Sequence, residues 1–255
     1  MRGSRAKPMV EPEVSAVVVT HNAAPWIERS LDSLRGTDAE VIVVDNDSTD
    51  GTPDLVRERF PEARLIEEDN RGFGAGNNAG MRAGSGRYFL LLNPDAWLME
   101  GALEAMVAFA DEHPEAAIVG PRLLNPDGTL QRSVRGYPSP WRIATEYFFL
   151  MSEEVDWCYR FRQAGWKILF FPGAEVTHVV GASLNPRQFK AIVRGHLQFL
   201  RKHRGLRVAE RARRVMLWGL RLRGVFFRGD RGRAYREAAQ WLGSGNTAAL
   251  LESTR

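Results

Sequence analysis

The sequence contains a single cysteine, Cys158, and no long apolar run. One cysteine excludes an intramolecular disulfide framework and a metal site built from several cysteines, and it suits a reducing compartment. No run approaches the roughly 18 apolar residues that a membrane-spanning helix needs. Residues 1–13 carry charges and prolines where a secretory signal needs an apolar core. We therefore expect a cytoplasmic chain without a membrane span and with a flexible N-terminus over 1–13.

Charge is distributed unevenly along the chain. Hydrophobic residues make up 44% and charged residues 26% of the 255 residues, which is globular composition and excludes disordered, collagen and coiled-coil classes. Residues 187–233 hold 15 basic and 2 acidic residues, a local charge of +13, and the whole chain carries +4, so the remainder carries −9. This asymmetry predicts a mildly acidic domain over 14–186 and a basic region over 187–255.

Short apolar runs rich in β-branched residues alternate with helical patterns in the first half of the chain. Continuous runs of this kind are typical of strands that are buried on both faces. We expect strands at 15–20, 40–44, 63–67, 87–92 and 167–171, and helices at 25–34, from Thr52 as N-cap, at 101–113 and from Ser152 as cap to about Ala164, with a hairpin turn at 125–128. The alternation predicts an α/β fold with a mostly parallel, doubly wound sheet.

Polar side chains follow three of the expected strands. They are Thr20-His21-Asn22, the run Asp45 to Thr52, and Asn93-Pro94-Asp95. Ligands of open α/β sheets bind beyond the carboxyl ends of the strands, and clustered oxygen ligands select magnesium or manganese. The alternative is that Asp and Asn only make turns and caps there.

A glycine-rich run covers residues 70–80. Its backbone could approach phosphates, or its glycines could let a helix pack tightly. Gly74, Gly76 and Ala79 also match the dinucleotide pattern G-x-G-x-x-A, with Asp95 about 20 residues on. The polar residues 67–71 intervene where that pattern needs direct exit from a strand, which argues against an NAD-binding site.

Taken together and in order, these motifs resemble an inverting family 2 glycosyltransferase with a GT-A fold, and most closely its bacterial rhamnosyltransferase-like branch. The resemblance rests on residues 17–22, 43–52, 70–80, 93–95, 152–160 with 164–166, and 176–183, and it covers about 14 to 205. It implies a nucleoside-diphosphate sugar as donor, of the dTDP or UDP type, and a divalent cation, Mg or Mn.

The resemblance also assigns roles to the residues at the strand ends. Asp45 would recognise the nucleotide base and ribose, with Asp47 close by, and Asp95 would hold the metal on the donor diphosphate. The other donor-binding residues would be Thr20, Asn22, Gly74, Asn77 and Asn93. His178 would add an imidazole metal ligand; the alternative is a histidine that ends a strand and is hydrogen-bonded locally.

Three carboxylates stand at the start of the helix expected after Ser152. Family resemblance places the base that deprotonates the acceptor among them, and we expect Glu154 in this role, with Asp156 as the second candidate. A helix start favours the ionised form that a base needs. The alternative is that these acids stabilise the helix, and that Asp156 pairs with Arg160 one turn on.

The resemblance is interrupted near 147–148 by an apparent internal deletion. Relatives usually carry a further segment at this point, whereas here residues 148–151 follow residues 138–147 directly. Omission of that segment would remove a strand on the acceptor side and expose backbone groups. A catalytically silent nucleotide-sugar-binding or scaffold protein is therefore the alternative function.

The basic region has two stretches with helical spacing of apolar residues. The first carries Phe189, Ile192, Val193, Leu197 and Leu200, and the second Val208, Ala212, Val215, Met216, Trp218 and Leu222. A basic amphipathic helix can lie on an anionic membrane surface, and the alternative is a packed helical appendage with solvated arginines. No nucleic-acid-binding module accompanies the charge, so we expect no nucleic-acid partner.

The leading hypothesis is a metal-dependent, inverting transferase that moves a sugar, with rhamnose as the first candidate, onto a cell-envelope glycan or lipid-linked acceptor. We expect it in the cytoplasm, or peripheral on the inner face of the cell membrane.

Overall fold

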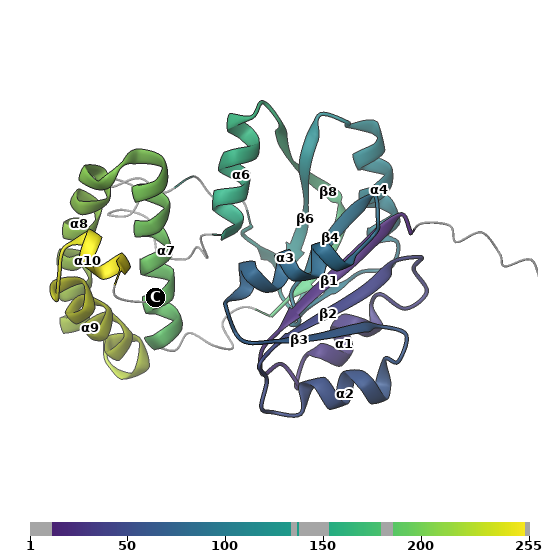
Figure 1. Ribbon diagram of the computed structural model, residues 1–255, viewed down its shortest axis with the longest axis horizontal. Coiled ribbons are helices and arrows are strands. Elements are labelled where there is room, and N and C mark those ends of the chain that lie inside the picture. Colours follow the sequence, from purple (N-terminus) through teal and green to yellow (C-terminus); the bar gives the residue numbers. More distant parts are fainter. Residues whose placement is uncertain (1–11, 134–136, 138–152, 180–185, 253–255) are drawn as a thin grey trace, which may run out of the picture. The chain divides into compact units, whose positions relative to one another are not determined.

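The computed structural model describes residues 12–133, 137, 153–179 and 186–252. The chain divides into two compact units, which Figure 1 shows as an α/β part and a helical part. Unit 1 consists of residues 1–133 and 169–180, and unit 2 of residues 134–168 and 181–255. The boundary expected at 186/187 stays a prediction, and the expected deletion near 147–148 and the Ser152 cap lie outside the described residues.

Unit 1 is built on a parallel sheet, sheet A. Its strands are β1 (Val14–Thr20), β2 (Glu40–Asn46), β3 (Arg64–Glu68) and β4 (Tyr88–Leu92), in the order β3-β2-β1-β4. All three neighbouring pairs are parallel, so the carboxyl ends of the four strands share one edge. The predicted α/β fold with a mostly parallel sheet is confirmed for this unit.

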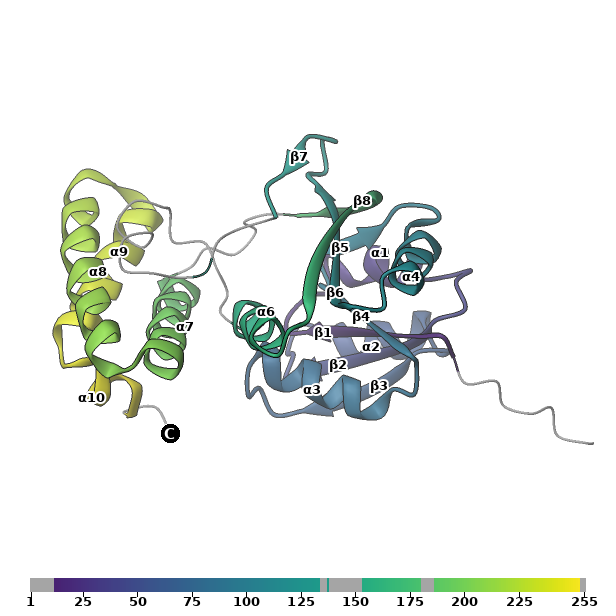
Figure 2. The same cartoon turned by 90° about the horizontal axis from the view of Figure 1, so that it is seen from above.

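Helices cover both faces of sheet A (Figure 2). They are α1 (Ile27–Asp32) and α2 (Thr52–Arg59) on one face and α3 (Phe73–Ala83) on the other. Successive residues of β1 serve opposite faces: Ala16 and Val18 pack with α1 and α2, and Val17 and Val19 pack with α3. Burial on both faces explains why the strands are continuous apolar runs rather than alternating ones.

The glycine-rich run is mostly helix α3, and its glycines permit close packing. A Cβ atom at Gly80 would lie 2.3 Å from a methyl of Val17, and one at Gly76 would lie 2.7 Å from a methyl of Val19. Helix and strand therefore approach to a distance that only glycine allows. Gly74, Gly76 and Ala79 all lie inside this helix rather than in a turn leaving a strand, which is not the geometry of a dinucleotide fingerprint.

A second sheet, sheet B, holds the strands β5 (Ala96–Leu98), β6 (Ala116–Leu124), β7 (Leu130–Gln131) and β8 (Lys167–His178), in the order β5-β8-β6-β7. Helix α4 (Ala102–Glu112) contacts β6. β6 and β7 form the predicted hairpin, with Leu124 opposite Leu130 and the Asn125 N–H bonded to the Thr129 carbonyl at 2.8 Å. β8 pairs antiparallel with β5, which places His178 opposite Ala96.

Unit 2 contains the helices α6 (Glu153–Gln163), α7 (Pro186–Arg204), α8 (Leu206–Phe226), α9 (Gly229–Gly243) and α10 (Thr247–Glu252). α8 packs against α7 and α9 and has Ala209, Ala212, Met216, Leu220 and Gly224 buried on one face. Trp218 and Leu222, predicted to share the apolar face with Met216, are instead exposed. At 100° per residue they point away from Met216 and Leu220, so α8 has two apolar stripes, of which one is covered.

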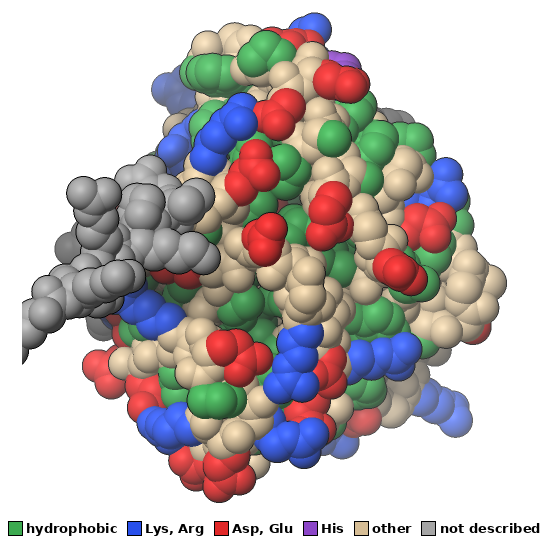
Figure 3. Space-filling view, turned by 90° about the vertical axis from the view of Figure 1, so that its right-hand side faces the viewer, with side chains coloured by type: hydrophobic (Ala, Val, Ile, Leu, Met, Phe, Trp, Pro, Cys, Tyr) green, Lys and Arg blue, Asp and Glu red, His purple; other side chains and the backbone are tan. Residues whose placement is uncertain are grey.

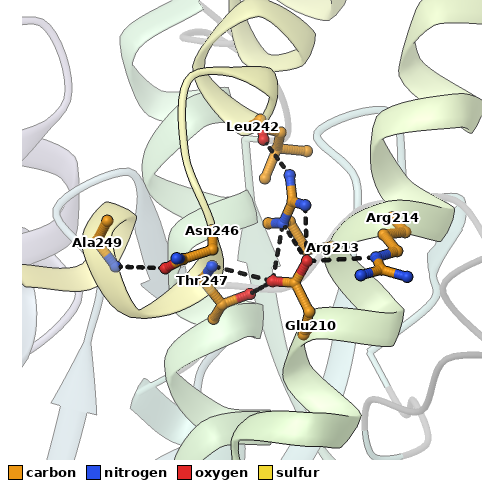
Figure 4. A network of polar contacts seen from close by, with 7 residues as sticks. All are labelled: Glu210, Arg213, Arg214, Leu242, Asn246, Thr247 and Ala249. Carbon is orange, nitrogen blue, oxygen red and sulfur yellow. Dashed lines mark hydrogen bonds and ion pairs between the residues drawn. The ribbon is translucent and has the colours of Figure 1, made fainter.

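Glu210 joins α8 to α10 through a network of polar contacts (Figure 4). Its carboxylate accepts hydrogen bonds from Arg213 Nη2 at 2.7 Å and from Thr247 Oγ1 and N at 2.8 and 3.0 Å. The hydrogen bond from Arg213 is the main reason that the pKa of Glu210 falls from 4.5 to about 2. The network therefore supplies the polar partners for the start of α10.

Helix α2 begins one residue earlier than the sequence predicts. Thr52, predicted as the N-cap of α2, is its first residue, and the N-cap position belongs to Gly51 with φ of 84°. The left-handed backbone there suits glycine.

Within the described ranges, no helix combines the length and the apolar character needed to cross a bilayer.

Candidate functional site

Two buried oxygen atoms without partners lie at the carboxyl edge of sheet A. Thr20 and Asp45 are in register at the ends of β1 and β2, and their exposed fractions are 1% and 2%. Asp45 Oδ2 accepts the Ser48 N–H at 2.9 Å, but Asp45 Oδ1 and Thr20 Oγ1 have no hydrogen-bond partner. A buried polar atom without a partner costs about 1–3 kcal/mol, so a ligand that supplies the missing hydrogen bonds is favoured here.

The loops after β1 and β2 are hydrogen-bonded to each other through Asn22. Its Oδ1 accepts the Thr49 N–H at 2.8 Å, and its N–H donates to Ser48 Oγ, also at 2.8 Å. Asn22 and Asp47 are the described non-glycine residues with positive φ, at 54° and 62°. Left-handed backbone at two neighbouring non-glycine positions is strained, and such strain is concentrated at functional sites.

Asp50 and Thr52 form further hydrogen bonds between the loop after β1 and the loop after β2. Asp50 accepts the Ala24 N–H at 3.0 Å and the Thr52 hydroxyl at 2.5 Å, and that hydroxyl accepts the Ala23 N–H at 3.0 Å. Burial alone raises the pKa of Asp50, but the hydrogen bonds from Thr52 and Ala24 outweigh it, so the pKa lies below its ordinary value. Asp47 and Asp50 are both exposed, and the hydrogen bonds of Asp50 make it a structural crosslink.

Asp95 and His178 meet because β5 pairs with β8. His178 Nε2 lies 3.4 Å from Asp95 Oδ1 and 3.4 Å from Asn93 Nδ2, and the Val179 N–H donates to the Asp95 carbonyl at 3.0 Å. β4 lies next to β1, with Leu92 opposite Val18. Asn93 and Asp95 therefore follow β4 at the same sheet edge that carries Thr20 and Asp45.

Gln131 of β7 orients the ring of His178. Its amide nitrogen lies 3.0 Å from the His178 carbonyl and 3.0 Å from Asn125 Oδ1, both of which are acceptors. Its Oε1 therefore faces His178 Nδ1, at 2.8 Å, and accepts a hydrogen bond from the Nδ1–H group. In the neutral ring this leaves the lone pair of Nε2 directed toward Asp95.

The donor set at Asp95 fits a divalent cation that keeps other ligands. A carboxylate and an imidazole lone pair at 3.4 Å suit manganese or magnesium, and Nε2 favours the softer of the two. No group of three or more His, Cys, Asp or Glu side chains that could hold a metal occurs among the described residues. Such a cation would therefore draw its remaining ligands from water and from a bound molecule.

Gly74 and Asn77 lie in the first half of α3. Asn77 is buried, and its amide donates to the Phe73 carbonyl at 3.2 Å. The Asn46 amide, next to Asp45, reaches the Gly72 carbonyl before this helix at 3.4 Å. The start of α3 is thus tied to the end of β2, and the donor-binding roles of Gly74 and Asn77 stay predictions.

The Asp156 carboxylate of α6 accepts hydrogen bonds from three side chains within unit 2. Its carboxylate accepts Lys202 Nζ at 2.8 Å, His203 Nε2 at 2.6 Å and Arg160 Nε at 2.9 Å. Burial on its own raises the pKa of Asp156, but these hydrogen bonds outweigh it and hold the pKa below its ordinary value. A carboxylate held in this way is a weak base, and it fastens α6 to α7.

Glu154 lies two residues before Asp156 on α6 and is exposed. Burial raises the pKa of the nearby Cys158 thiol, and the Glu154 carboxylate raises it further. The thiol is thus a poor nucleophile. The roles of Glu154 and Asp156 as candidate bases stay predictions.

Sequence reasoning missed two residues that shape these groups. Gln131 acts on His178 over a separation of 47 residues, and His203 reaches Asp156 over the same separation. The sequence places Gln131 just after the turn at 125–128, which predicts that it lies in a strand but does not predict its contact with His178.

A family model described as "Glycosyl transferase family 2" matches residues 15–169. Among curated proteins, the N-acetylglucosaminyl-diphospho-decaprenol L-rhamnosyltransferase of Mycobacterium tuberculosis is 28% identical over 228 residues, covering 64% of this chain and 74% of that protein. The succinoglycan biosynthesis protein ExoO of Rhizobium meliloti is 40% identical over 105 residues, covering 39% of this chain and 30% of that protein.

Two solved structures have the same fold. The mannosyltransferase PcManGT from Pyrobaculum calidifontis, in complex with GDP-Man and Mn2+, has a TM-score of 0.56 and 20% identity, covering 96% of this chain and 80% of its own. S. aureus TarS 1–349 has a TM-score of 0.52 and 16% identity, covering 94% of this chain and 81% of its own. At these identities the likeness concerns the fold alone, and it confirms the predicted GT-A type.

Proposed function

The chain belongs to glycosyltransferase family 2, and from this premise we propose that it transfers a sugar from a nucleoside-diphosphate donor with inversion at the anomeric carbon. Family membership favours a transferase over the catalytically silent alternative. The observation that carries the proposal is the pair of buried, unpartnered oxygens at Thr20 and Asp45, beside the Asp95–His178 pair at one sheet edge.

In this proposal the nucleoside binds over the ends of β1 and β2. Asp45 Oδ1 is an acceptor that awaits an N–H or O–H donor, and both bases and ribose supply such groups. Asn22 and Asp47 lie in the loops that follow these two strands, and Asn93, Gly74 and Asn77 complete the expected donor-binding set. Because the loops are already bonded to each other, little ordering cost remains on binding.

Asp95 and His178 would hold a divalent cation, Mg or Mn, at the diphosphate. Such a cation would neutralise the negative charge that develops on the leaving nucleoside diphosphate. Gln131 holds the Nδ1 side of the His178 ring, so that Nε2 faces this position. The manganese in the complex of PcManGT supports this expectation, since that protein has the same fold.

Glu154 is the proposed general base. It would remove the proton of the acceptor hydroxyl on the side of the anomeric carbon opposite the leaving group. Asp156 would act in support, because its three hydrogen-bond partners fix α6 while they lower its own basicity.

Rhamnose, carried by dTDP, is the first candidate sugar, and a lipid-linked or cell-envelope glycan is the candidate acceptor. The mycobacterial relative supports both, since its name gives L-rhamnose and a decaprenol-linked acceptor. A UDP-sugar is the second candidate donor. We place the protein in the cytoplasm, at the inner face of the membrane that would carry such an acceptor.

The alignment to the same relative supports a shortened chain, and we propose that the shortening lies in the acceptor half. It spans 228 positions, whereas 64% of this 255-residue chain is about 163 residues. About 65 positions therefore lie opposite gaps in this chain. The expected donor-binding residues all precede residues 138–152, and the expected metal ligands Asp95 and His178 flank them, so we expect donor binding to survive the shortening.

Calorimetry of the full chain with dTDP, UDP and GDP, each with and without Mn2+, tests the donor site. A product assay with the corresponding nucleotide sugars and a lipid-linked acceptor then tests transfer. We expect manganese-dependent binding of one nucleotide and turnover of its sugar. Binding without turnover on any acceptor would favour the silent alternative, and no nucleotide binding would overturn the proposal.

A further inference from the structure

The outward face of α8 carries one continuous stripe of arginine and large apolar side chains. Residues one or two turns apart follow each other along it: Arg207, Arg211, Arg214, Trp218, Arg221 with Leu222, and Val225. At 3.6 residues per turn these positions lie within about a third of the helix circumference. They oppose the buried face of α8, so packing within unit 2 does not account for their residue types.

The C-terminal half of this stripe is an exposed apolar ridge. Trp218, Leu222, Val225 and Phe226 have exposed fractions of 72%, 62%, 77% and 75%. Single exposed apolar residues are ordinary, but four large ones on successive turns form a contiguous patch, and such patches mark an interaction site.

Unpaired positive charge flanks the ridge. Arg207, Arg211 and Arg221 form no ion pair with any residue for which the structure gives a position, and Arg214 has one contact at 3.4 Å with Glu210. On the other side, a groove of about 630 Å³ between α8 and α9 begins at Val225 and is lined by Arg221 and Arg236. The face of unit 1 in Figure 3 differs, since acidic and basic side chains are interspersed there.

We propose that this face of α8 docks on the surface of an anionic lipid bilayer, with the apolar ridge inserted among the acyl chains and the arginines on the headgroup phosphates. Trp and Phe at the boundary, with arginines beside them, are the composition of an interfacial helix, because long basic side chains keep their charge at the headgroups while their stems lie along apolar surface. Charge complementarity identifies an anionic bilayer as the partner, because residues 187–233 carry a net charge of +13.

This inference deepens the proposed function, because a lipid-linked acceptor lies in such a bilayer. Its test does not require turnover. The full chain is floated with vesicles of phosphatidylcholine alone and with vesicles that contain 30% phosphatidylglycerol, on the order of the anionic fraction that gives a strong surface potential. We expect binding to the second kind only, and release on raising the salt concentration.

Two variants separate the parts of the surface. Trp218→Ser with Phe226→Ser should weaken vesicle binding at least tenfold, and Arg207→Glu with Arg211→Glu should do the same on anionic vesicles. Leu130→Ser with Trp166→Ser is the matched control, since both residues are exposed and lie outside α8, and it should bind as the parent does. Nucleotide binding, measured by calorimetry, should be unchanged in the ridge variant, which separates the failure of docking from the failure of the donor site.

Three results would overturn the inference. They are equal binding to neutral and anionic vesicles, unchanged binding of the ridge variant, and absence of vesicle binding. Sedimentation of the lipid-free chain provides a further check. A dimer that dissociates in the ridge variant, without vesicle binding, would assign the face to a second copy of the chain instead.

Discussion

Gln131 Oε1 accepts a hydrogen bond from Nδ1 of His178 at 2.8 Å, which leaves Nε2 as the atom that faces Asp95. Because this bond selects the ring tautomer, Gln131→Leu should weaken Mn2+ binding roughly tenfold to a hundredfold. Titration of the full chain followed by Mn2+ electron paramagnetic resonance measures this directly. Gln163→Leu, an exposed glutamine on α6, is the control. Equal affinity in both variants would remove Gln131 from the site.

Asp95→Asn should abolish the manganese dependence of nucleotide binding. The substitution keeps the shape of the side chain but removes the charged ligand, so the affinity should fall to the value measured without metal. Calorimetry with and without Mn2+ gives both numbers. Asp38→Asn, at an exposed position before β2, should leave them unchanged. A full manganese effect in Asp95→Asn would assign the metal to other residues.

Thr20→Val should make the free protein more stable and the donor site weaker. The valine removes a buried hydroxyl that has no partner, so the free energy of unfolding should rise by about 1 kcal/mol, while nucleotide affinity should fall about tenfold. Urea unfolding and calorimetry measure the two effects.

Thr247→Val is the comparison for stability. Thr247 is also fully buried, but its hydroxyl is bonded to Glu210 at 2.8 Å. Its loss should lower the free energy of unfolding by about 1–2 kcal/mol. A decrease in both variants would show that Thr20 contributes to the fold rather than to a ligand site.

Glu154→Gln and Asp156→Asn should fail in different ways. Loss of the general base should reduce turnover about 10²- to 10⁴-fold with donor binding intact. Asp156→Asn loses charge-assisted bonds to three partners, so it should lower the free energy of unfolding by about 2 kcal/mol. Steady-state kinetics and unfolding curves distinguish them. Full turnover in Glu154→Gln would exclude it as the base.

The stability of unit 2 should depend on pH through Glu210. Its pKa falls from 4.5 to about 2 in the folded chain, so its stabilisation is complete above about pH 4.5 and is lost as the pH falls toward 2. Glu210→Gln should therefore lower the free energy of unfolding by about 2 kcal/mol at pH 7 and by almost nothing near pH 2. Urea unfolding of both proteins at a series of pH values measures the difference. A constant difference would contradict the assignment.

The sequence predicted β1 and β2 of sheet A well, because these two central strands are buried on both faces and are therefore continuous apolar runs. The residues at its carboxyl edge follow from the same logic, since parallel strands end together. Gln131 could not be predicted, because its contact with His178 depends on strand pairing over 47 residues. The error at Trp218 and Leu222 has a different origin. α8 carries two apolar stripes, and periodicity alone does not say which one α7 and α9 cover.

The pairing of β5 with β8 brings together residues from the two ends of a long stretch of chain. Asp95 comes before that stretch and His178 comes at its close, and the contact between them is fixed by the register of β5 with β8 and by Gln131 of β7, which orients the histidine ring. Excision of residues that leaves β5, β7 and β8 in place would therefore leave the two side chains facing each other. Acceptor specificity could therefore change during evolution while the donor-binding residues stay the same.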